Sequence, residues 1–184
     1  MKRHRRSFHE FGDAHEVTFS CYRRFPFFRA ERTCEWLKQA IDSARVSESF
    51  ALWAYVFMPD HIHLLILPVS GDADMARILK SIKSPVGRRA LRYVRTHSPE
   101  WLPRLSRTRG QKREYLFWQS GGGYDRNVTN PDTLLSMIDY IHANPVRKGY
   151  VERPRDWRWS SAAWYDDHTR VPINVDPIPN DWLE

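Results

Sequence analysis

The sequence predicts a single α+β domain, and three observations lead to this prediction. The chain has 184 residues, 14% of them aromatic, with eight tryptophans, which is enough apolar surface for one buried core and argues against disorder. Short stretches that alternate apolar and polar residues, or are apolar throughout, predict strands. Longer stretches between them carry apolar residues at helical spacing and predict helices.

The first predicted strand and the first predicted helix lie near the N-terminus. Residues 16–22 alternate, with Val17, Phe19 and Cys21 on one face and polar or amphipathic residues on the other, which is typical of a strand. After a turn, residues 31–46 repeat apolar side chains every three or four positions. This spacing predicts an amphipathic helix.

Two adjacent apolar stretches follow, and only residues 58–60 separate the two strands that they predict. Residues 50–57 are apolar on both faces, which predicts a central strand that is covered on both sides. The next stretch, residues 58–68, has a proline near each end and predicts a buried strand that pairs with the first as a hairpin. Because side chains alternate along a strand, His61 and His63 point the same way, roughly 6–7 Å apart, and can converge on one divalent ion. The alternative is that they are two polar residues at a fraying strand end.

Residues 74–95 predict a second helix with a strongly basic outer face. Pro85 interrupts the helical pattern, so we expect a kink or two abutting helices there. Between Arg77 and Arg113 the chain holds twelve Lys or Arg and one acid. Such a run is often only a solvated helix face, but this bias continues through the loop 96–113 and favours a polyanionic partner that orders the loop. The candidate phosphate contacts are Lys80, Lys83, Arg88, Arg89, Arg92 and Arg95.

A glycine-rich turn separates two further predicted strands. Residues 115–119 predict one strand and residues 124–128 a possible partner for it. Gly121, Gly122 and Gly123 lie between them and superficially resemble a phosphate cradle, but no Gly-Lys-Ser/Thr follows. A turn that requires positive φ, or a close approach of the backbone to a ligand, explains them better, and we interpret them as a turn.

The last predicted helix begins at Asn-Pro-Asp, residues 130–132, where a capping side chain precedes a proline and an acid. Tyr140 projects about 200° away from Ile138 and is not needed for the buried stripe of this helix. Asn144 lies one turn later on the same side as Tyr140, and Pro145 is expected to end the helix there. The alternatives are that Tyr140 is an ordinary amphipathic tyrosine and that Asn144 only caps the C-terminus of the helix.

Composition limits the partners and the compartment. The net charge of +7 and the pI near 9.6 indicate an acidic partner, with nucleic acid the first candidate. The basic N-terminus is not followed by an apolar segment, so no secretory signal is expected, and no apolar run approaches the roughly 20 residues that cross a bilayer. Cys21 and Cys34 form no metal-type cluster and are expected to be reduced, so we expect a cytoplasmic protein.

Four motifs occur in the order and approximate spacing of a known family. They are Met-Pro-Asp-His-Ile-His at 58–63, Trp-Gln-Ser-Gly-Gly-Gly-Tyr-Asp at 118–125, Tyr-Ile-His-Ala-Asn-Pro-Val-Arg-Lys-Gly at 140–149 and Asp-Trp-Arg-Trp-Ser-Ser at 156–161. Together they closely resemble the single-tyrosine HUH (His-hydrophobic-His) transposases of the insertion-sequence-200-like family, specifically the REP-associated branch. The resemblance predicts a basic N-terminal arm at 1–13, an HUH transposase or endonuclease domain at 14–165, and an acidic, proline-containing tail at 166–184.

This resemblance implies a ferredoxin-like antiparallel sheet with helices packed on it, and it assigns roles. His61 and His63 match the metal-binding pair and Tyr140 matches the nucleophile. Asn144 lies where relatives have a glutamine or asparagine that completes the metal site, whereas Asp60 need not be a ligand. The family is associated with Mg²⁺ or Mn²⁺; two imidazoles and an amide suit a transition metal, so Mn²⁺ satisfies both arguments best.

The expected reaction is nicking and joining of single-stranded or hairpin DNA through a 5′-phosphotyrosine. Tyr124, Arg126 and Trp164 are candidate DNA contacts, since aromatic rings can stack unpaired bases. The resemblance suggests hairpin-forming repetitive elements as substrate, and either a monomer or a homodimer. Two alternatives remain: a catalytically silent nucleic-acid-binding protein derived from a transposase, and a domain in which the histidines hold a structural metal.

Overall fold

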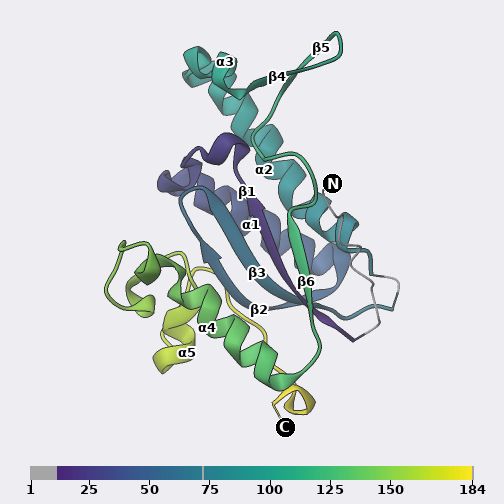
Figure 1. The fold of residues 1–184 in the computed structure, drawn as a ribbon, viewed down its shortest axis with the longest axis vertical. Coiled ribbons are helices and arrows are strands. Elements are labelled where there is room, and N and C mark those ends of the chain that lie inside the picture. The colour runs from purple at the N-terminus through teal and green to yellow at the C-terminus, as the bar shows by residue number, and fades with distance from the viewer. Residues whose placement is uncertain (1–11, 72, 184) are drawn as a thin grey trace, which may run out of the picture.

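The structure, a computed structural model, describes residues 12–71 and 73–183. Almost all of the predicted basic arm at 1–13 therefore lies outside the described residues. The chain forms a four-stranded antiparallel sheet with helices on both faces, as Figure 1 shows. The prediction of a single α+β domain with an antiparallel sheet is confirmed.

The sheet has the strand order β2-β3-β1-β6, built from β1 (Ala14–Ser20), β2 (Phe50–Phe57), β3 (His61–Pro68) and β6 (Tyr124–Val128). With the intervening helices this is the order βαββαβ of a ferredoxin-like fold. The register places Thr18 of β1 opposite both His63 of β3 and Tyr124 of β6. Side chains from three strands are thereby aligned in one row across the sheet.

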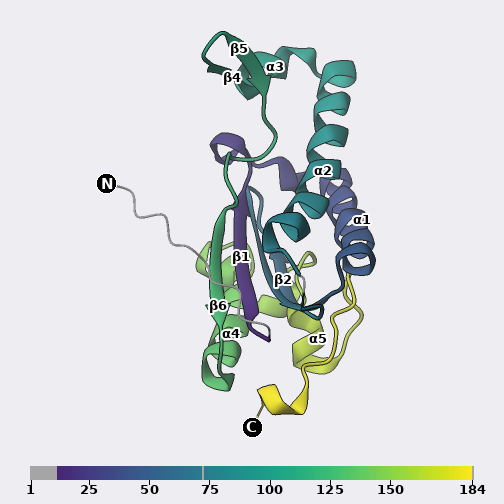
Figure 2. The ribbon, with the colours of Figure 1, turned by 90° about the vertical axis from the view of Figure 1, so that its right-hand side faces the viewer.

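Two layers of helices cover the sheet. The helices α1 (Glu31–Glu48) and α2 (Met75–His97) pack on one face, and α4 (Pro131–Arg147) packs on the other, as the turned view in Figure 2 shows. A hydrophobic core lies on each face of the sheet, and side chains of β3 alternate between the two. Ile62 and Leu64 face α1 and α2, whereas Leu65 faces α4. His61 and His63 have the same parity as Leu65, so they lie on the α4 face.

The strand β2 is an edge strand, and the prediction that it is central was wrong. Its residues are nonetheless buried, because a segment that follows α4 runs along its outer edge and supplies the missing backbone partners. The bonds are Phe57 N to Trp159 O at 2.8 Å, Ser161 N to Tyr55 O at 3.1 Å, and Asp176 N to Leu52 O at 2.8 Å. Asp176, which belongs to the predicted tail at 166–184, therefore pairs with the edge of the sheet.

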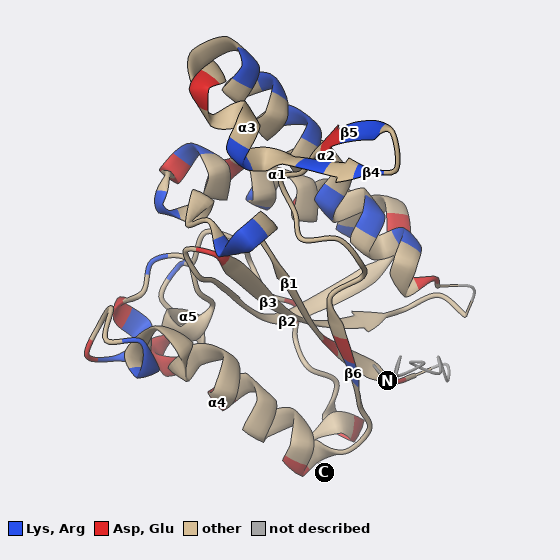
Figure 3. Cartoon of the chain, turned by 45° about the horizontal axis from the view of Figure 1, so that its top comes forward, with Lys and Arg blue, Asp and Glu red and all other residues tan. Residues whose placement is uncertain are grey.

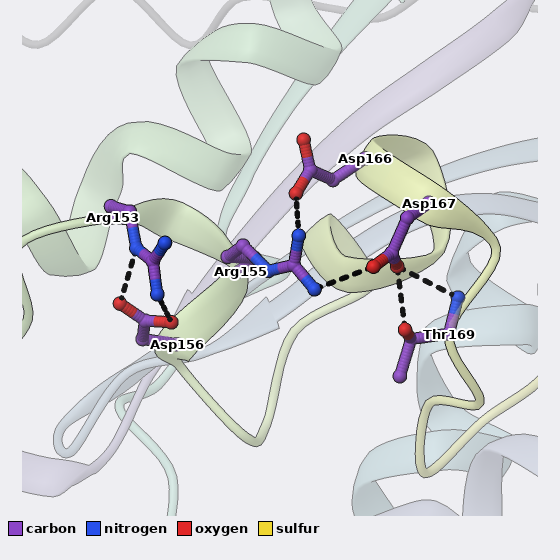
Figure 4. A network of polar contacts seen from close by, with 6 residues as sticks. All are labelled: Arg153, Arg155, Asp156, Asp166, Asp167 and Thr169. Carbon is purple, nitrogen blue, oxygen red and sulfur yellow. Dashed lines mark hydrogen bonds and ion pairs between the residues drawn. The ribbon is translucent and has the colours of Figure 1, made fainter.

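Ion pairs on the surface hold the turns of this C-terminal segment, which includes α5 (Ala162–Asp167). Figure 4 shows Arg155 between Asp166 and Asp167, and Asp167 also accepts a hydrogen bond from the backbone of Thr169. Exposed pairs of this kind contribute little to stability, so burial of the segment on β2 contributes more to its position.

The basic half of α2 extends beyond the sheet and carries a small hairpin. The helix continues through Pro85 as one helix, so the alternative of two abutting helices was wrong; the proline lies on the exposed side, where the lost hydrogen bond is least costly. The predicted loop 96–113 contains regular structure, since α3 (Leu102–Leu105), β4 (Ser106–Arg109) and β5 (Lys112–Tyr115) follow α2. The prediction of a strand at 115–119 was wrong beyond Tyr115, where β5 ends. The remaining short helices are Tyr22–Arg24, Phe27–Arg29, Pro99–Trp101, Pro154–Asp156 and Asn180–Trp182.

The helix α4 begins where predicted and ends later than predicted. The side chain of Asn130 accepts a hydrogen bond from Thr133 N at 3.0 Å, which caps the first turn. Pro145 lies inside the last turn and cannot donate to the carbonyl of Ile141, but the side-chain amide of Asn144 donates to that carbonyl instead, at 3.3 Å. This replacement explains why the helix continues past Asn144.

None of the helices in the described part of the chain is long and apolar enough to cross a membrane.

Candidate active site

A cavity of about 870 Å³ lies between the sheet and α4. It is lined by residues of three strands, of α4 and of the turns after β1 and α4, and these include both strand histidines and Tyr140. The lining residues from the sheet are Glu16, Thr18, His61, His63, Tyr124 and Arg126. The structure thus brings together the predicted metal pair, the predicted nucleophile and two of the predicted DNA contacts.

The ring of His63 is fixed by a buried carboxylate. Its Nδ1 lies 3.0 Å from Glu16 Oε1 and 2.8 Å from Thr18 Oγ1, and the Thr18 hydroxyl itself donates to Glu16 Oε1 at 2.6 Å. An ionised carboxylate only accepts hydrogen bonds, and the Thr18 proton is already given to Glu16, so the proton between the ring and its two partners belongs to Nδ1. In the neutral form of this ring, Nε2 is the atom that carries the lone pair, as a metal ligand must.

The ring of His61 is fixed in the same way by a different carboxylate. Its Nδ1 lies 2.7 Å from Asp60 Oδ1, and burial lowers the pKa of His61 below its ordinary value despite that hydrogen bond. Asp60 is held in turn by Arg24, whose guanidinium donates to Asp60 Oδ2 at 3.2 Å. Arg23 and Arg24 both have positive φ, a strained backbone that places Arg24 at the cavity.

These contacts fit a divalent metal site. A neutral imidazole with a carboxylate on Nδ1 and a free Nε2 is the form in which histidine binds metal ions in proteins. In the described residues no three His, Cys, Asp or Glu side chains form a metal cluster. Asn144 is the predicted amide ligand and lines the same cavity.

The amide of Asn144 has only one orientation compatible with its contacts. It lies 2.8 Å from Tyr140 O and 3.3 Å from Ile141 O, and because both are carbonyl oxygens, the atom that faces them is the NH₂ group. The amide oxygen is therefore the end that is available as a ligand. This contact also links the predicted metal ligand to the helix turn that carries Tyr140.

Tyr140 projects from α4 into the cavity with 43% of its surface exposed. Its ring meets the ring of His63 edge-on, with centroids 5.8 Å apart, and the guanidinium of Arg147 lies 5.1 Å from the centroid of the phenol ring. A tyrosine on a helix surface normally contacts solvent or the core, whereas this one lies between an imidazole and a cation. The side chain of Tyr140 is accessible to a ligand that occupies the cavity.

The helix that carries Tyr140 is fastened to the edge of the sheet by a buried histidine. His142 lies 2.8 Å through Nε2 from Ser161 Oγ, and burial lowers its pKa to about 4, so it is neutral under ordinary conditions. Ser161 accepts a hydrogen bond from Tyr55 N of β2. The C-terminal segment therefore positions the helix that carries Tyr140, although it contributes no residue with a predicted catalytic role.

The predicted DNA contacts fall on different surfaces. Tyr124 and Arg126 line the cavity, whereas the basic residues of α2 lie on the opposite face of the sheet. Figure 3 shows these cations as blue bands along α2 and the β4–β5 hairpin. Arg89 faces α1, where it donates to Gln39 Oε1 at 2.8 Å and covers the ring of Trp36. Trp164 lies on α5, outside the cavity.

Several residues of the cavity were missed from the sequence. Glu16 contacts His63 from the neighbouring strand β1, and Asp60 contacts His61, the next residue in the chain. From the sequence, Asp60 was considered only as a possible ligand. A weak signal existed for Glu16 and Thr18, which share the polar face of an otherwise apolar strand. The cations at the rim were assigned no role from the sequence, although two of them lie in the motif at 140–149; they are Arg24, Arg29, Arg147 and Lys148.

A metal-fitting pair of histidines facing one helix-borne tyrosine defines the class of single-tyrosine HUH proteins. The family model described as "Transposase IS200 like" matches residues 12–144, and the chain belongs to this family. It is 31% identical over 138 residues to a protein of Haemophilus influenzae that carries the provisional name REP-associated tyrosine transposase, covering 72% of this chain and 66% of that one. This chain thus spans just under two thirds of that relative.

Two further comparisons agree. The REP-associated tyrosine transposase of Escherichia coli K12 is 26% identical over 149 residues, covering 80% of this chain and 72% of that protein. A solved structure of a REP-associated tyrosine transposase bound to a REP hairpin matches with a TM-score of 0.64 and 23% identity, covering 97% of this chain and all of the other. The resemblance to the REP-associated branch is confirmed.

Proposed function

We propose that this protein is a divalent-metal-dependent enzyme that nicks and rejoins single-stranded DNA, with Tyr140 as the nucleophile. One observation supports the proposal most strongly. Two separate carboxylates, Glu16 and Asp60, each hydrogen-bond Nδ1 of one histidine, and both histidines line the cavity of Tyr140. A protein that only binds DNA needs neither these paired contacts nor an exposed tyrosine between them.

The residues that would hold the metal are His61 and His63 through Nε2, and Asn144 through its amide oxygen. When bound, Mg²⁺ or Mn²⁺ would neutralise part of the phosphate charge and orient the phosphate. The nitrogen ligands favour Mn²⁺ of the two. The rim cations, Arg147 foremost, would bind further phosphate oxygens of the same strand.

The proposed chemistry conserves the phosphodiester bond energy. The Tyr140 oxygen attacks the phosphorus and loses its proton, the bond from phosphorus to the 3′ oxygen breaks, and that oxygen leaves as a 3′ hydroxyl. The DNA stays joined to Tyr140 through a 5′ phosphotyrosine. Attack by a free 3′ hydroxyl reverses the step and releases Tyr140, so joining needs no nucleoside triphosphate.

The proposed substrate is a hairpin from a repetitive element together with its single-stranded flank. The family relatives are named after REP elements, and the matched solved structure carries a REP hairpin. The cavity suits a single strand, because the aromatic ring of Tyr124 is 45% exposed at its edge and can stack on an unpaired base.

The test is cleavage of labelled hairpin oligonucleotides with Mn²⁺, Mg²⁺ or a chelator, analysed on denaturing gels. We expect cleavage with the metals and none with the chelator. His61→Ala with His63→Ala should abolish cleavage while the melting temperature of the metal-free protein changes little. Cleavage that survives chelation would refute the metal requirement, and unfolding on chelation alone would support a structural metal.

A further inference from the structure

The glycine turn before β6 contains one glycine that the fold does not require. Gly123 has φ +95°, and a Cβ there would lie 2.2 Å from the carbonyl oxygen of Thr18, so only glycine fits. Gly121 has φ +101°, which also favours glycine. Gly122 is different, because its φ lies outside the left-handed region and a Cβ would meet nothing within 4 Å. The fold leaves room for a side chain that the sequence omits.

This turn lies between two surfaces that could bind nucleic acid. On the α2 face, Gly121 and Gly122 help to line a groove of about 480 Å³, together with three cations and several apolar side chains. Lys83 Nζ donates to Gly121 O at 3.1 Å across this groove. On the α4 face, Tyr124 and Arg126 follow directly and line the catalytic cavity. The turn thus connects the groove to the cavity at the edge of the sheet.

The groove has the chemistry of a site for a single strand. Lys80 and Arg88 are exposed at its rim, aromatic and aliphatic side chains form its walls, and none of its lining residues is acidic. Cations that follow a backbone beside apolar surfaces for bases are typical of single-strand binding. Within the residues that the structure describes, the N–H of Gly122 donates no hydrogen bond, so it can donate to a ligand.

We propose that the strand to be cut passes from the α2 groove over the 120–123 turn into the catalytic cavity, with its phosphodiester backbone in contact with Gly122. A bare glycine allows a phosphate to approach the main chain and its N–H group. The inference rests on the proposed function for the identity of the strand. It explains how cations on the face of the sheet opposite Tyr140 can serve the same substrate.

The experiment measures binding of two labelled probes, with chelator present so that no cleavage occurs. One probe is a hairpin with a single-stranded flank, and the other is the same hairpin without the flank. Gly122→Ala should weaken binding of the flanked probe about ten- to hundredfold, the effect of losing one hydrogen bond to a charged group, and leave the other probe unchanged. The melting temperature should not fall, because the added Cβ meets nothing.

Charge variants at the same position provide a second test. Gly122→Asp should weaken binding of the flanked probe more than Gly122→Asn does, and the difference in affinity should shrink at high salt. The matched control is Val46→Asp against Val46→Asn, which makes the same charge change at a position of α1 that is 84% exposed. That pair should differ much less.

Two further variants test both ends of the path. Lys80→Ala in the groove and Arg126→Ala in the cavity should each weaken binding of the flanked probe more than binding of the hairpin without the flank. The proposal is wrong if only one of them does so, if Gly122→Ala binds the flanked probe normally, or if it weakens both probes equally. These measurements need no catalysis, so absence of a covalent adduct would refute the proposed function and leave the path standing.

Discussion

The buried carboxylate Glu16 should determine how well the protein binds Mn²⁺, although it need not touch the ion. Glu16 is 3% exposed, and its Oε1 receives the contacts of both Thr18 and His63. Glu16→Gln keeps an acceptor oxygen of the same shape and removes the charge. The contact with Nδ1 then changes from a charge-assisted to a neutral hydrogen bond, which is roughly half as strong.

The expected decrease in Mn²⁺ affinity follows from the weaker hydrogen bond to His63. Changing a residue that hydrogen-bonds a metal-binding histidine typically lowers metal affinity about 10–100-fold, or about 1.4–2.7 kcal/mol. Asp60→Asn removes the corresponding charge beside His61 and should have an effect of similar size. The double variant should bind Mn²⁺ more weakly than either single variant, because the two carboxylates act on different rings.

The assay is a Mn²⁺ titration of the DNA-free protein, followed by electron paramagnetic resonance or calorimetry. Glu100→Gln is the matched control, because it removes one negative charge from an exposed position next to α2. Unchanged Mn²⁺ affinity in both Glu16→Gln and Asp60→Asn would refute the reasoning. A loss in Glu16→Gln as complete as that in His63→Ala would instead identify Glu16 as a ligand.

Two other predictions concern DNA binding and the thiols. Arg88→Ala with Arg92→Ala should make the plot of log affinity against log salt shallower by about 1.4 units, if each arginine neutralises one phosphate. Arg89→Ala should change the slope less, because this guanidinium is already engaged by α1; equal effects would contradict the assignment. Burial raises the pKa of Cys34 to about 12, which keeps the thiol protonated at pH 8, so iodoacetamide should label it only after unfolding. Rapid labelling of the folded protein, read by mass spectrometry, would contradict this.

The periodicity of the sequence was sufficient for the parts of the fold that depend on local pattern. The alternation around His61 and His63 predicted that both rings face the same way, and the structure places both on the α4 face. The Asn130 cap predicted where α4 begins. These features depend on neighbouring residues alone, which is why they can be recognised in a single sequence.

Features that depend on distant residues could not be predicted in this way. β2 is apolar on both faces although it lies at the edge of the sheet, because Ser161 and Asp176, more than 100 residues later, cover its edge. The carboxylate of Glu16 meets His63 through strand pairing, which periodicity does not report. The end of α4 was misjudged because Pro145 predicts a break, and only the structure shows the Asn144 amide in place of the missing donor.

The most direct test of the account is covalent capture of DNA on Tyr140. Wild-type protein is incubated with a flanked hairpin oligonucleotide and Mn²⁺, digested with protease, and the DNA-linked peptide is identified by mass spectrometry. The account predicts a phosphotyrosine linkage at Tyr140, no adduct with Tyr140→Phe, and nearly unchanged hairpin binding by that variant, since only one hydroxyl is lost. Cleavage by Tyr140→Phe at the wild-type rate, or an adduct on another residue, would contradict it.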